Sequence, residues 1–458
     1  MKDVAGKISD AMHRARTLFR SGTTRDLAWR RAQLRRMLSW LETSEATLLA
    51  ALKSDLAKPE LEAYASEILT IKGEIRHVLK HLSKWSRRKR VRPPWFIWPA
   101  QPWIQPEPFG VVLVLAPWNY PLYLALMPVV NALAAGNVAI IKPSEWTPQS
   151  VLQIENLAGV LDPGAVAVIS GAADVAELLL EQPFDFIFFT GGGAIGRRVG
   201  VRAAERGVPC VLELGGKNPC IVDETAPVEA TARRIVWAKF FNAGQTCVAP
   251  DSVWVHRSLY EPLLAGLERV VRQFYGDDPL QSPDLARLIH ERHFERVKRF
   301  IAEGKVVCGG RSEVASLRIE PTILTDVSPD AHVMREEIFG PVLPVLPYDE
   351  LEDVLSALRE DTPLALYIHT RNREVERRVL GQTRSGSVCI NDHIMQINIH
   401  GLPFGGVGES GIGRYHGRHG FDTFSHMRAI LRQPSWLDNP LRYPPTAGKL
   451  RWIKKILG

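Results

Sequence analysis

The sequence predicts an α/β protein in which a doubly wound parallel sheet is joined to a second α/β domain. Two series of short apolar runs, rich in Val, Ile and Leu, alternate with helical segments, the first from Val111 and the second after Glu213. Such runs indicate parallel strands that are buried on both faces. The chain of 458 residues is also longer than a single hydrophobic core usually supports, which favours two interlocked domains.

The first ninety residues carry apolar side chains at intervals of three and four, which predicts two or three helices. Residues 1–22 form the first, an amphipathic helix whose charges interrupt the continuous apolar stretch that a signal peptide needs. The five cysteines are widely spaced, odd in number and without a CxxC pair, which argues against a disulfide framework and a zinc site. We therefore expect a reducing, cytoplasmic location and no metal.

Residues 91–110, VRPPWFIWPAQPWIQPEPFG, break the helical pattern. Repeated prolines exclude a helix there and permit extended edge segments, so the stretch predicts an arm or hairpin. Its tryptophans would favour aggregation if they were left exposed. Either a partner subunit covers them, or part of the arm folds back on its own chain.

Two basic clusters, Arg87–Arg92 and Lys449–Lys455, stand out against a modest formal net charge of +7. No recognition motif lies beside the first cluster, so a solvated charged face is preferred over a binding patch, and no nucleic-acid partner is expected. The second cluster alternates with Trp452 and Ile453, a composition that could touch an anionic membrane surface but is too short to span one. A terminal helix packed on its own domain is the preferred interpretation.

In the first series, each of the runs VVLVLAP, NVAIIKPSE, AVAVIS and FDFIFFTGGG ends near residues with chemical potential. Ligands of parallel sheets bind at the carboxyl ends of the strands. Asn119, Lys142 and Gly191 therefore mark the edge where a ligand is expected. The second series contains a helix at 228–244 and strands at 251–256, 321–327, 364–370 and 387–392.

The strand that ends at Thr190 leads through Gly191–Gly193 and Gly196 into a helix. Glycines at such a turn let the backbone approach a phosphate, which the free N–H groups of the helix start can bind. The spacing differs from GxGxxG, and a purely structural glycine turn explains the segment equally well.

Cys247 lies in NAGQTCVAP, after a helix and a glycine-containing break, on a loop where functional residues concentrate. By itself it would be interpreted as a small buried hydrophobic residue, and Glu213 in ELGGK as a surface glutamate. Together with Asn119 they match one reaction. A thiolate attacks an aldehyde to give a thiohemiacetal, loss of hydride leaves a thioester, and a base activates the water that cleaves it. An amide N–H stabilises the oxyanion.

Seven motifs, in this order, resemble the aldehyde dehydrogenase superfamily: PWNYP, KPSE, FTGGGAIG, ELGGK, GQTCVAP, EEIFGP and LPFGGVGESGIG. They span most of the chain, which makes the match far more specific than any single motif. The short N-terminus, the PWNYP and GQTCVAPD variants and the ending YHG…FDTFSH are similar to the class 3 branch, which includes fatty, aromatic and coniferyl aldehyde dehydrogenases. The resemblance implies a Rossmann-type cofactor domain, an α/β catalytic domain and a small bridging β arm.

The resemblance also implies a role for each site residue. Cys247 would be the nucleophile, Glu213 the general base and Asn119 an oxyanion donor. Lys142 and Glu145 would meet the adenosine ribose. The further cofactor-binding residues would be Thr190, Gly191, Gly196, Glu337 at the nicotinamide ribose and Phe339 near the nicotinamide, and the substrate pocket would be formed by Trp118, Tyr120 and Phe404.

The implied cofactor is NAD, with NADP as the alternative. A rigid Glu145 would repel the 2′-phosphate of NADP, whereas class 3 enzymes often accept both cofactors. Two departures from the family bear on this preference: the loop Gly191–Gly193 carries no side chain after its first glycine, and Glu409 stands where related sequences frequently have Asn. The substrate would be a small-molecule aldehyde, aliphatic or aromatic, which oxidation converts to the carboxylic acid.

The resemblance divides the chain into four parts, and a homodimer bridged by the arm is expected. The parts are an NAD(P)-binding domain at 1–84 and 107–212, a catalytic domain at 213–413, an oligomerisation arm at 85–106 and 414–445, and a basic apolar C-terminal tail at 446–458.

Two alternatives stay open. A CoA-acylating or acyl-phosphate-reducing relative would share the fold and Cys247 but pass the acyl group to an acceptor other than water. Glu213 argues against it, because that chemistry gains nothing from a base that activates water. A non-catalytic binding or structural protein of the same fold would have no reason to keep Cys247, Glu213, Asn119, Lys142 and Glu337 together.

Overall fold

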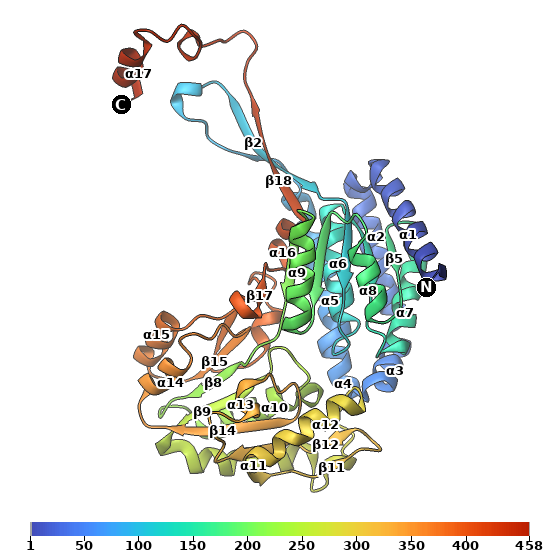
Figure 1. The fold of residues 1–458 in the computed structure, drawn as a ribbon, viewed down its shortest axis with the longest axis vertical. Coiled ribbons are helices and arrows are strands. Elements are labelled where there is room, and N and C mark those ends of the chain that lie inside the picture. Colours follow the sequence, from blue (N-terminus) through green and yellow to red (C-terminus); the bar gives the residue numbers. More distant parts are fainter. Residues whose placement is uncertain (1, 458) are drawn as a thin grey trace.

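The computed structural model describes the backbone of residues 2–457 and the side chains of residues 3–455. Two α/β units lie one above the other, and a slender β arm projects from them (Figure 1). Each unit contains a largely parallel sheet. The predicted α/β class, with one such sheet in each of two units, is therefore confirmed.

Among the described residues, the N-terminal region contains five α-helices where the sequence predicted two or three. Ser44 separates two of them, and Ala57, in the left-handed region with φ 51°, ends the third. A π-helical turn over Tyr64–Ile68 divides the fourth from the fifth. Apolar periodicity does not reveal such short breaks. The helices are α1 (Lys2–Arg20), α2 (Leu27–Thr43), α3 (Glu45–Leu56), α4 (Glu60–Ala63) and α5 (Leu69–Trp85).

The first sheet has the strand order β17-β7-β6-β3-β4-β5. Its elements are β3 (Val111–Leu115), β4 (Val138–Lys142), β5 (Val166–Val168), β6 (Phe186–Thr190), β7 (Cys210–Glu213), β17 (Gly411–Ile412), α6 (Tyr123–Ala135), α7 (Pro148–Val160), α8 (Ala173–Leu180) and α9 (Gly193–Glu205). All neighbours pair in parallel except β17 with β7. In β3, Val112 and Val114 pack in the cluster that contains α6, whereas Val111 and Leu113 pack in the cluster that contains α1 and α8. The run is continuous in sequence because both of its faces are buried.

The second sheet has the order β10-β13-β14-β9-β8-β15-β16 and is parallel except for β10. The helices α10 and α11 lie on one face, and α14 and α15 pack with the other. Its elements are β8 (Pro219–Val222), α10 (Val228–Phe240), β9 (Ser252–His256), α11 (Tyr260–Tyr275), α12 (Glu291–Phe300), β10 (Lys305–Cys308), β13 (Thr322–Thr325), α13 (His332–Arg335), β14 (Val342–Tyr348), α14 (Leu351–Ala357), β15 (Ala365–His369), α15 (Arg373–Gln382) and β16 (Ser387–Ile390), with a separate hairpin of β11 (Ser312–Glu313) and β12 (Arg318–Ile319).

The projecting arm is a three-stranded antiparallel sheet of order β1-β2-β18. Its strands are β1 (Lys89–Arg90), β2 (Gln101–Pro108) and β18 (Ser425–Arg432). The predicted hairpin is therefore confirmed, and its closing strand comes from the other end of the chain, after α16 (Gly417–Thr423), which packs on α5 and α6. The limits predicted for the four parts of the chain stay predictions.

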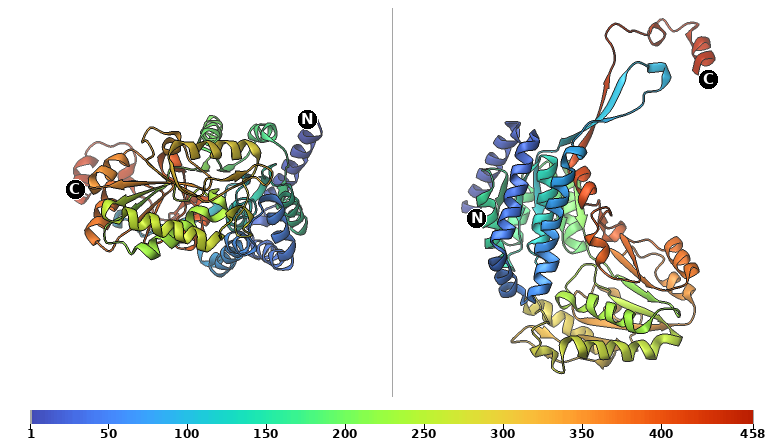
Figure 2. Two further views of the ribbon diagram at one scale, coloured as in Figure 1. Left: turned by 90° about the horizontal axis from the view of Figure 1, so that it is seen from below. Right: turned by 180° about the vertical axis from the view of Figure 1, so that it is seen from behind.

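The last helix, α17 (Lys449–Leu457), lies at the far end of the arm rather than on a domain (Figures 1 and 2). Leu450 is 62% exposed and Trp452 is 60% exposed. The expectation that this helix packs on its own domain is wrong, because β18 carries the chain away from both sheets before the helix begins. No helix in residues 2–457 is long and apolar enough to cross a membrane.

Candidate active site

Cys247 lies on an irregular loop that follows α10. The chain leaves the helix through a 3₁₀ turn in which Asn242 and Ala243 have left-handed φ values of 52° and 51°. Gly244 follows with φ 76°, and a Cβ there would lie 2.3 Å from the carbonyl oxygen of Gly340. Only glycine fits both the backbone conformation and the close approach. The break seen in the sequence thus turns the chain sharply and brings Cys247 to a cavity.

Two buried amides hold the Cys247 loop in place. The Asn218 side chain donates to the carbonyl oxygens of Cys247 at 2.8 Å and Ala249 at 3.0 Å, and its own oxygen accepts from the Ala365 N–H at 2.8 Å. The Gln245 side chain accepts from the Ile289 N–H at 3.1 Å. Neither residue was predicted to be part of the site, although Gln245 stands inside the motif GQTCVAP and Asn218 directly follows ELGGK.

A cavity of about 950 Å³ opens beside Cys247. Tyr120, Tyr123, Phe404 and Ile394 line it together with Cys247 itself. Tyr120 is fixed by a 2.5 Å hydrogen bond between its hydroxyl and that of Thr246. A largely aromatic and aliphatic wall around one thiol suits an apolar substrate.

Trp118 does not line this cavity. Its ring packs edge-on against Phe339, with 5.4 Å between the ring centres, and against His293 at 5.6 Å. Trp118 precedes the turn of PWNYP and faces the EEIFGP loop, and its assignment to the substrate pocket stays a prediction. Tyr120, two positions later, faces the cavity.

The environment of Cys247 opposes ionisation of its thiol. Burial raises the pKa of the thiol well above its usual range, and the nearby carboxyl groups of Glu337 and Glu213 raise it further. The sulfur is therefore a protonated thiol in this state. Attack on a substrate requires a group that takes its proton.

Glu213 ends β7 and lies next to Thr190 in the sheet register, with Gly411 of β17 on its other side. Its side chain is only 2% exposed, and neither carboxyl oxygen has a hydrogen-bond partner among the described residues. Burial raises the pKa of this carboxyl well above its usual value. A carboxyl without partners and with a raised pKa is the usual form of a general base.

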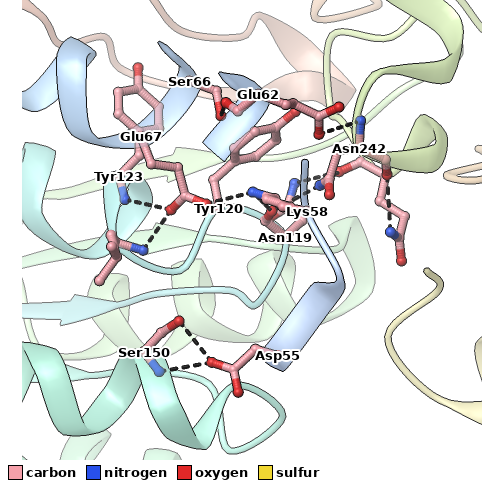
Figure 3. Close-up of polar contacts among 12 residues, drawn as sticks. Asp55, Lys58, Glu62, Ser66, Glu67, Asn119, Tyr120, Tyr123, Ser150 and Asn242 are labelled. Atoms are coloured by element: carbon pink, nitrogen blue, oxygen red, sulfur yellow. Dashed lines mark hydrogen bonds and ion pairs between the residues drawn. The ribbon is translucent and has the colours of Figure 1, made fainter. Parts of the chain in front are cut away.

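Asn119 follows β3 and is held from two sides (Figure 3). Its amide nitrogen donates one hydrogen bond to the Gln245 carbonyl at 3.0 Å, which leaves a second N–H. Its backbone oxygen accepts from Lys58 at 2.8 Å and from the Asn242 side chain at 2.9 Å. The backbone oxygen is therefore clamped, and the free N–H belongs to a side chain that has little freedom to move.

Lys58 is itself paired with Glu67 at 2.5 Å, and both side chains are fully buried. The other oxygen of Glu67 accepts from the N–H groups of Leu122 and Tyr123 at the start of α6 (Figure 3). This pair was not predicted, because a lysine and a glutamate in helical surroundings look like surface residues. The pair connects the segment before α4 and the π-helical turn to the loop that carries Asn119.

The carboxyl edge of the first sheet gathers the residues expected to bind a cofactor. Lys142 ends β4, and its ammonium group lies 3.0 Å from Glu145. The Thr190 hydroxyl at the end of β6 is buried without a partner among the described residues. A Cβ at Gly192 would meet nothing within 4 Å, so the N-terminus of α9 is open to a phosphate.

Gly196 and Gly191, unlike Gly192, pack closely against neighbouring side chains. A Cβ at Gly196 would lie 2.3 Å from a methyl group of Leu214, and a Cβ at Gly191 would lie 2.7 Å from the ring of Phe189. These glycines let α9 approach the sheet closely. Gly191 and Gly196 therefore have a packing role as well, and their predicted contact with a cofactor, like that of Gly192, stays a prediction.

Glu337 lies against the loop that follows β7. A Cβ at Gly215 would be 2.1 Å from a carboxyl oxygen of Glu337, so only glycine admits this side chain. Burial raises the pKa of Glu337 to about 8, with Asp251 adding to the effect. Phe339, two residues later, has φ 51°, and its carbonyl accepts from His293 at 2.8 Å. Glu337 thus lies near enough to Cys247 to raise the pKa of its thiol, and it does not line the substrate cavity.

Among the described residues, one group has side chains placed to hold a metal ion: Cys220, His369 and His393. Their ligand atoms lie within 4.8 Å of one another in the core of the second unit, and none of the three lines the cavity. The absence of a metal stays a prediction.

The sequence matches the model of the Aldehyde dehydrogenase family over residues 3–430. It is 40% identical over 452 residues, 98% of each chain, to a 4,4′-diaponeurosporen-aldehyde dehydrogenase of Staphylococcus aureus. It is 43% identical over 442 residues, 96% of this chain and 94% of the other, to human aldehyde dehydrogenase family 3 member B1. Class 3 relatives are thus among its most similar proteins, as the motifs predicted.

Solved structures of aldehyde dehydrogenases agree with the family match. The substrate-bound state of Staphylococcus aureus AldH superposes with a TM-score of 0.95 at 39% identity and covers 98% of this chain and 99% of the other. An aldehyde dehydrogenase of Mycobacterium tuberculosis complexed with NAD+ superposes with a TM-score of 0.86 at 29% identity, over 95% and 92% of the two chains. The predicted aldehyde dehydrogenase fold is confirmed, and the chain belongs to the aldehyde dehydrogenase family.

Proposed function

We propose that Cys247, Glu213 and Asn119 carry out the NAD(P)-dependent oxidation of an aldehyde to its carboxylic acid, the activity of this family. The observation that carries the proposal is the placement of one thiol on an apolar cavity, with an unpartnered carboxyl group close enough to raise its pKa. Phe404 and Tyr120 would hold the substrate.

The first step joins substrate and enzyme. The thiol of Cys247 loses its proton to a base, and the sulfur lone pair attacks the aldehyde carbon. The electrons of the C=O double bond move to oxygen, where the free N–H of Asn119 and the Cys247 backbone N–H stabilise the charge. The product is a thiohemiacetal, and loss of a hydride from its carbon leaves a thioester on Cys247.

The second step releases the acid. Glu213 takes a proton from water, the hydroxide oxygen attacks the thioester carbon, and the carbon–sulfur bond breaks. Cys247 leaves as the thiolate. The enzyme returns to its starting state when the proton that Glu213 took from water is given up and the thiolate is protonated again. An unpartnered carboxyl of raised pKa suits this role, because it accepts a proton more readily than an ordinary glutamate.

The residues at the carboxyl edge of the first sheet fit a dinucleotide. The open N-terminus of α9 at Gly192 fits a pyrophosphate, and the Lys142–Glu145 pair fits ribose hydroxyls. Glu337 and Thr190 each offer a buried oxygen that has no hydrogen-bond partner among the residues that the structure describes. When bound, NAD+ supplies the acceptor for the hydride. Because Glu145 is anionic and would repel a 2′-phosphate, we favour NAD and expect Glu145→Gln to raise kcat/KM for NADP relative to NAD.

An apolar cavity suits aliphatic and aromatic aldehydes alike. The relative of Staphylococcus aureus is named as a 4,4′-diaponeurosporen-aldehyde dehydrogenase, so that aldehyde belongs in a test of this cavity. A kcat/KM series across chain length and ring-bearing aldehydes would rank the two classes.

We further infer a homodimer in the cytoplasm. In the described chain, β16 is an open edge of the second sheet and β18 is an open edge of the arm sheet. Open edges are usually paired, and pairing the β18 edge of one protomer with the β16 edge of another would close both. The five cysteines are all free thiols, which supports a reducing compartment. Sedimentation velocity would read the oligomeric state.

Rapid kinetics test the catalytic proposal. Cys247→Ala should abolish oxidation while NAD binding persists, whereas Cys308→Ala, another half-buried cysteine, should leave the rate unchanged. Glu213→Gln should slow thioester hydrolysis more than acylation, so that a burst of NADH precedes a slow steady state. An unchanged steady-state rate in Glu213→Gln would refute its role, and acyl-CoA formed in place of acid when CoA is added would favour the acyl-transfer alternative.

A further inference from the structure

Three side chains with metal-binding atoms meet in the core of the second unit. Cys220 lies in β8, His369 ends the neighbouring strand β15, and His393 follows β16. All three side chains are fully buried, and their ligand atoms lie within 4.8 Å of one another. None of them lines the substrate cavity, so the catalytic proposal gives this cluster no role.

The two imidazoles lack the hydrogen bonds that buried polar groups normally form. Among the described residues, neither ring nitrogen of His393 has a partner, and Nε2 of His369 has none either. Nδ1 of His369 lies 3.4 Å from the Thr231 hydroxyl. A proton on Nδ1 that is donated to this hydroxyl leaves a lone pair on Nε2, which is the usual arrangement of a histidine metal ligand. Buried nitrogens without partners are rare in folded proteins, and a bound ion would satisfy them.

The loop that carries His393 is held in an unfavourable conformation. Asn391 and Ile394, on either side of His393, have left-handed φ values of 56° and 62°. Such a value is rare for a β-branched residue like isoleucine. The Asn391 amide donates to the Thr370 carbonyl at 2.8 Å and accepts from the Thr370 N–H at 2.9 Å. The loop therefore fixes the His393 ring against that of His369, with 4.9 Å between the ring centres.

The charges around the cluster favour a monovalent ion. Burial lowers the pKa of both imidazoles, and the nearby Arg234 lowers it further, so both rings are neutral. A Cys220 thiolate, two neutral imidazoles and a monovalent cation together carry no net charge. A divalent cation would leave a positive charge in a buried site beside Arg234, which is costly. Thiolate is a soft ligand that selects Cu(I) among the ions that imidazole also binds.

We propose that Cys220, His369 and His393 bind one Cu(I) ion in a three-coordinate site. The Cys220 thiol releases its proton to solvent as the copper–sulfur bond forms, and neither copper nor sulfur changes oxidation state. Bonds of about 2.0–2.3 Å, typical of first-row ions, place neighbouring ligand atoms of a trigonal site about 3.5–4.0 Å apart. Each ligand atom therefore needs to move by less than about 1 Å.

A copper site here would replace the expectation of no metal, which depends on cysteine spacing alone. Ligands from three separate segments leave no such spacing. The inference goes beyond the proposed function and does not depend on it.

Zinc fits the cluster less well than Cu(I). Structural zinc sites take four protein ligands, and the group among the described residues has three. Cys389 of β16 is the cysteine on a neighbouring strand, but in the sheet register it lies on the far side of Tyr367 from Cys220. Cys389 is therefore a matched control for Cys220 and is not expected to be a fourth ligand.

The metal content of the full-length protein tests the inference. Cys247→Ala serves as the parent, because the thiol beside the cavity would itself bind Cu(I). Since the cluster is fully buried, the protein is expressed with copper in the medium, so that the ion can enter during folding. After anaerobic purification, we expect one copper ion per chain in this parent and in the parent with Cys389→Ser. We expect none after Cys220→Ser or His393→Phe is added.

Two features keep the test independent of misfolding. The variant His393→Phe keeps a ring against Tyr367 and removes nitrogens that have no partners, so it should fold. X-ray absorption at the copper edge needs no change in the core, and it should show one sulfur and two imidazole nitrogens around the ion. Thr231→Val removes the partner of His369 Nδ1, and it should weaken Cu(I) binding roughly 10–100-fold in competition with the chelator bicinchoninate.

Four outcomes would overturn the inference. The first is a parent protein without copper, and the second is equal copper content after Cys220→Ser. The third is an absorption spectrum with two or more sulfur ligands, which would assign the copper to other thiols. Zinc bound at the cluster in place of copper would contradict the choice of a monovalent ion.

Discussion

Substitution of Lys58 by methionine should destabilise the protein and slow catalysis together. The change leaves Glu67 fully buried without its cation. Breaking a buried ion pair on one side costs about 3–5 kcal/mol. Glu67 keeps two backbone N–H donors from α6, so we expect the lower end, about 3 kcal/mol. At about 2–4 °C per kcal/mol, the conversion for domains of 150–250 residues, a loss of about 3 kcal/mol corresponds to a drop in Tm of about 6–12 °C.

The catalytic effect follows from Asn119. Lys58 is one of two donors on its backbone oxygen, and its loss frees the loop that aims the amide. Removal of an oxyanion donor lowers kcat on the order of 10²–10³-fold, so partial displacement should lower kcat about tenfold or more with little change in KM. The rate is measured well below the Tm of the variant, where it is folded.

A double variant and a neighbouring pair separate the causes. Lys58→Met with Glu67→Gln removes both charges but keeps an oxygen for the α6 N–H groups, so stability should largely return while kcat stays low. Lys72→Met removes the cation from a pair whose other member, Glu45, is partly exposed, and it should cost about 0–1 kcal/mol. A Lys58→Met protein that melts with the parent would refute the reasoning.

Three further predictions rest on single contacts. Burial raises the pKa of Glu62 to about 8, so between pH 5 and 8 the folded state holds a proton that the unfolded state loses. The free energy of unfolding should therefore fall as pH rises from 5 to 8, by less than about 1.4 kcal/mol per pH unit because the side chain is partly exposed. In Glu62→Gln the urea midpoint of unfolding should depend less on pH. Gly244→Ala should cost about 1–3 kcal/mol and disorder the Cys247 loop, seen as a lower Tm and altered reactivity of the Cys247 thiol; equal thiol reactivity would contradict this. Trp118→Ala should raise KM for NAD without changing the ranking of aldehydes, which a shifted ranking would disprove.

The sequence predicted the first sheet well because its strands are buried on both faces and therefore form continuous apolar runs. It did not predict β14, a central strand of the second sheet, because Pro344 and Pro347 interrupt the pattern. Proline normally argues against a central strand. Only the partners β13 and β9 on either side make clear that the segment is extended.

The chemistry at the site was predictable where a motif carried it, and the supporting contacts were not. Cys247, Glu213 and Asn119 stand at chain positions where a loop or strand end is evident. Lys58 and Asn218 act through partners that are 61 and 29 positions away along the chain, and spacing of that kind leaves no local pattern. The packing of Trp118 on Phe339 depends likewise on how two distant loops meet.

Glu213 illustrates why such a site opposes stability. Burial raises the pKa of this carboxyl in the folded protein above its value of 4.5 in the unfolded chain, so its ionisation destabilises the fold at neutral pH and not at low pH. Glu213→Gln should therefore stabilise the protein at pH 8, on the order of 1 kcal/mol, while it loses thioester hydrolysis. The gain should shrink at pH 4, where the glutamate is protonated in both states. Urea unfolding of the two proteins at both pH values measures this, and an equal difference at pH 4 and pH 8 would show that the charge of Glu213 is not its cause.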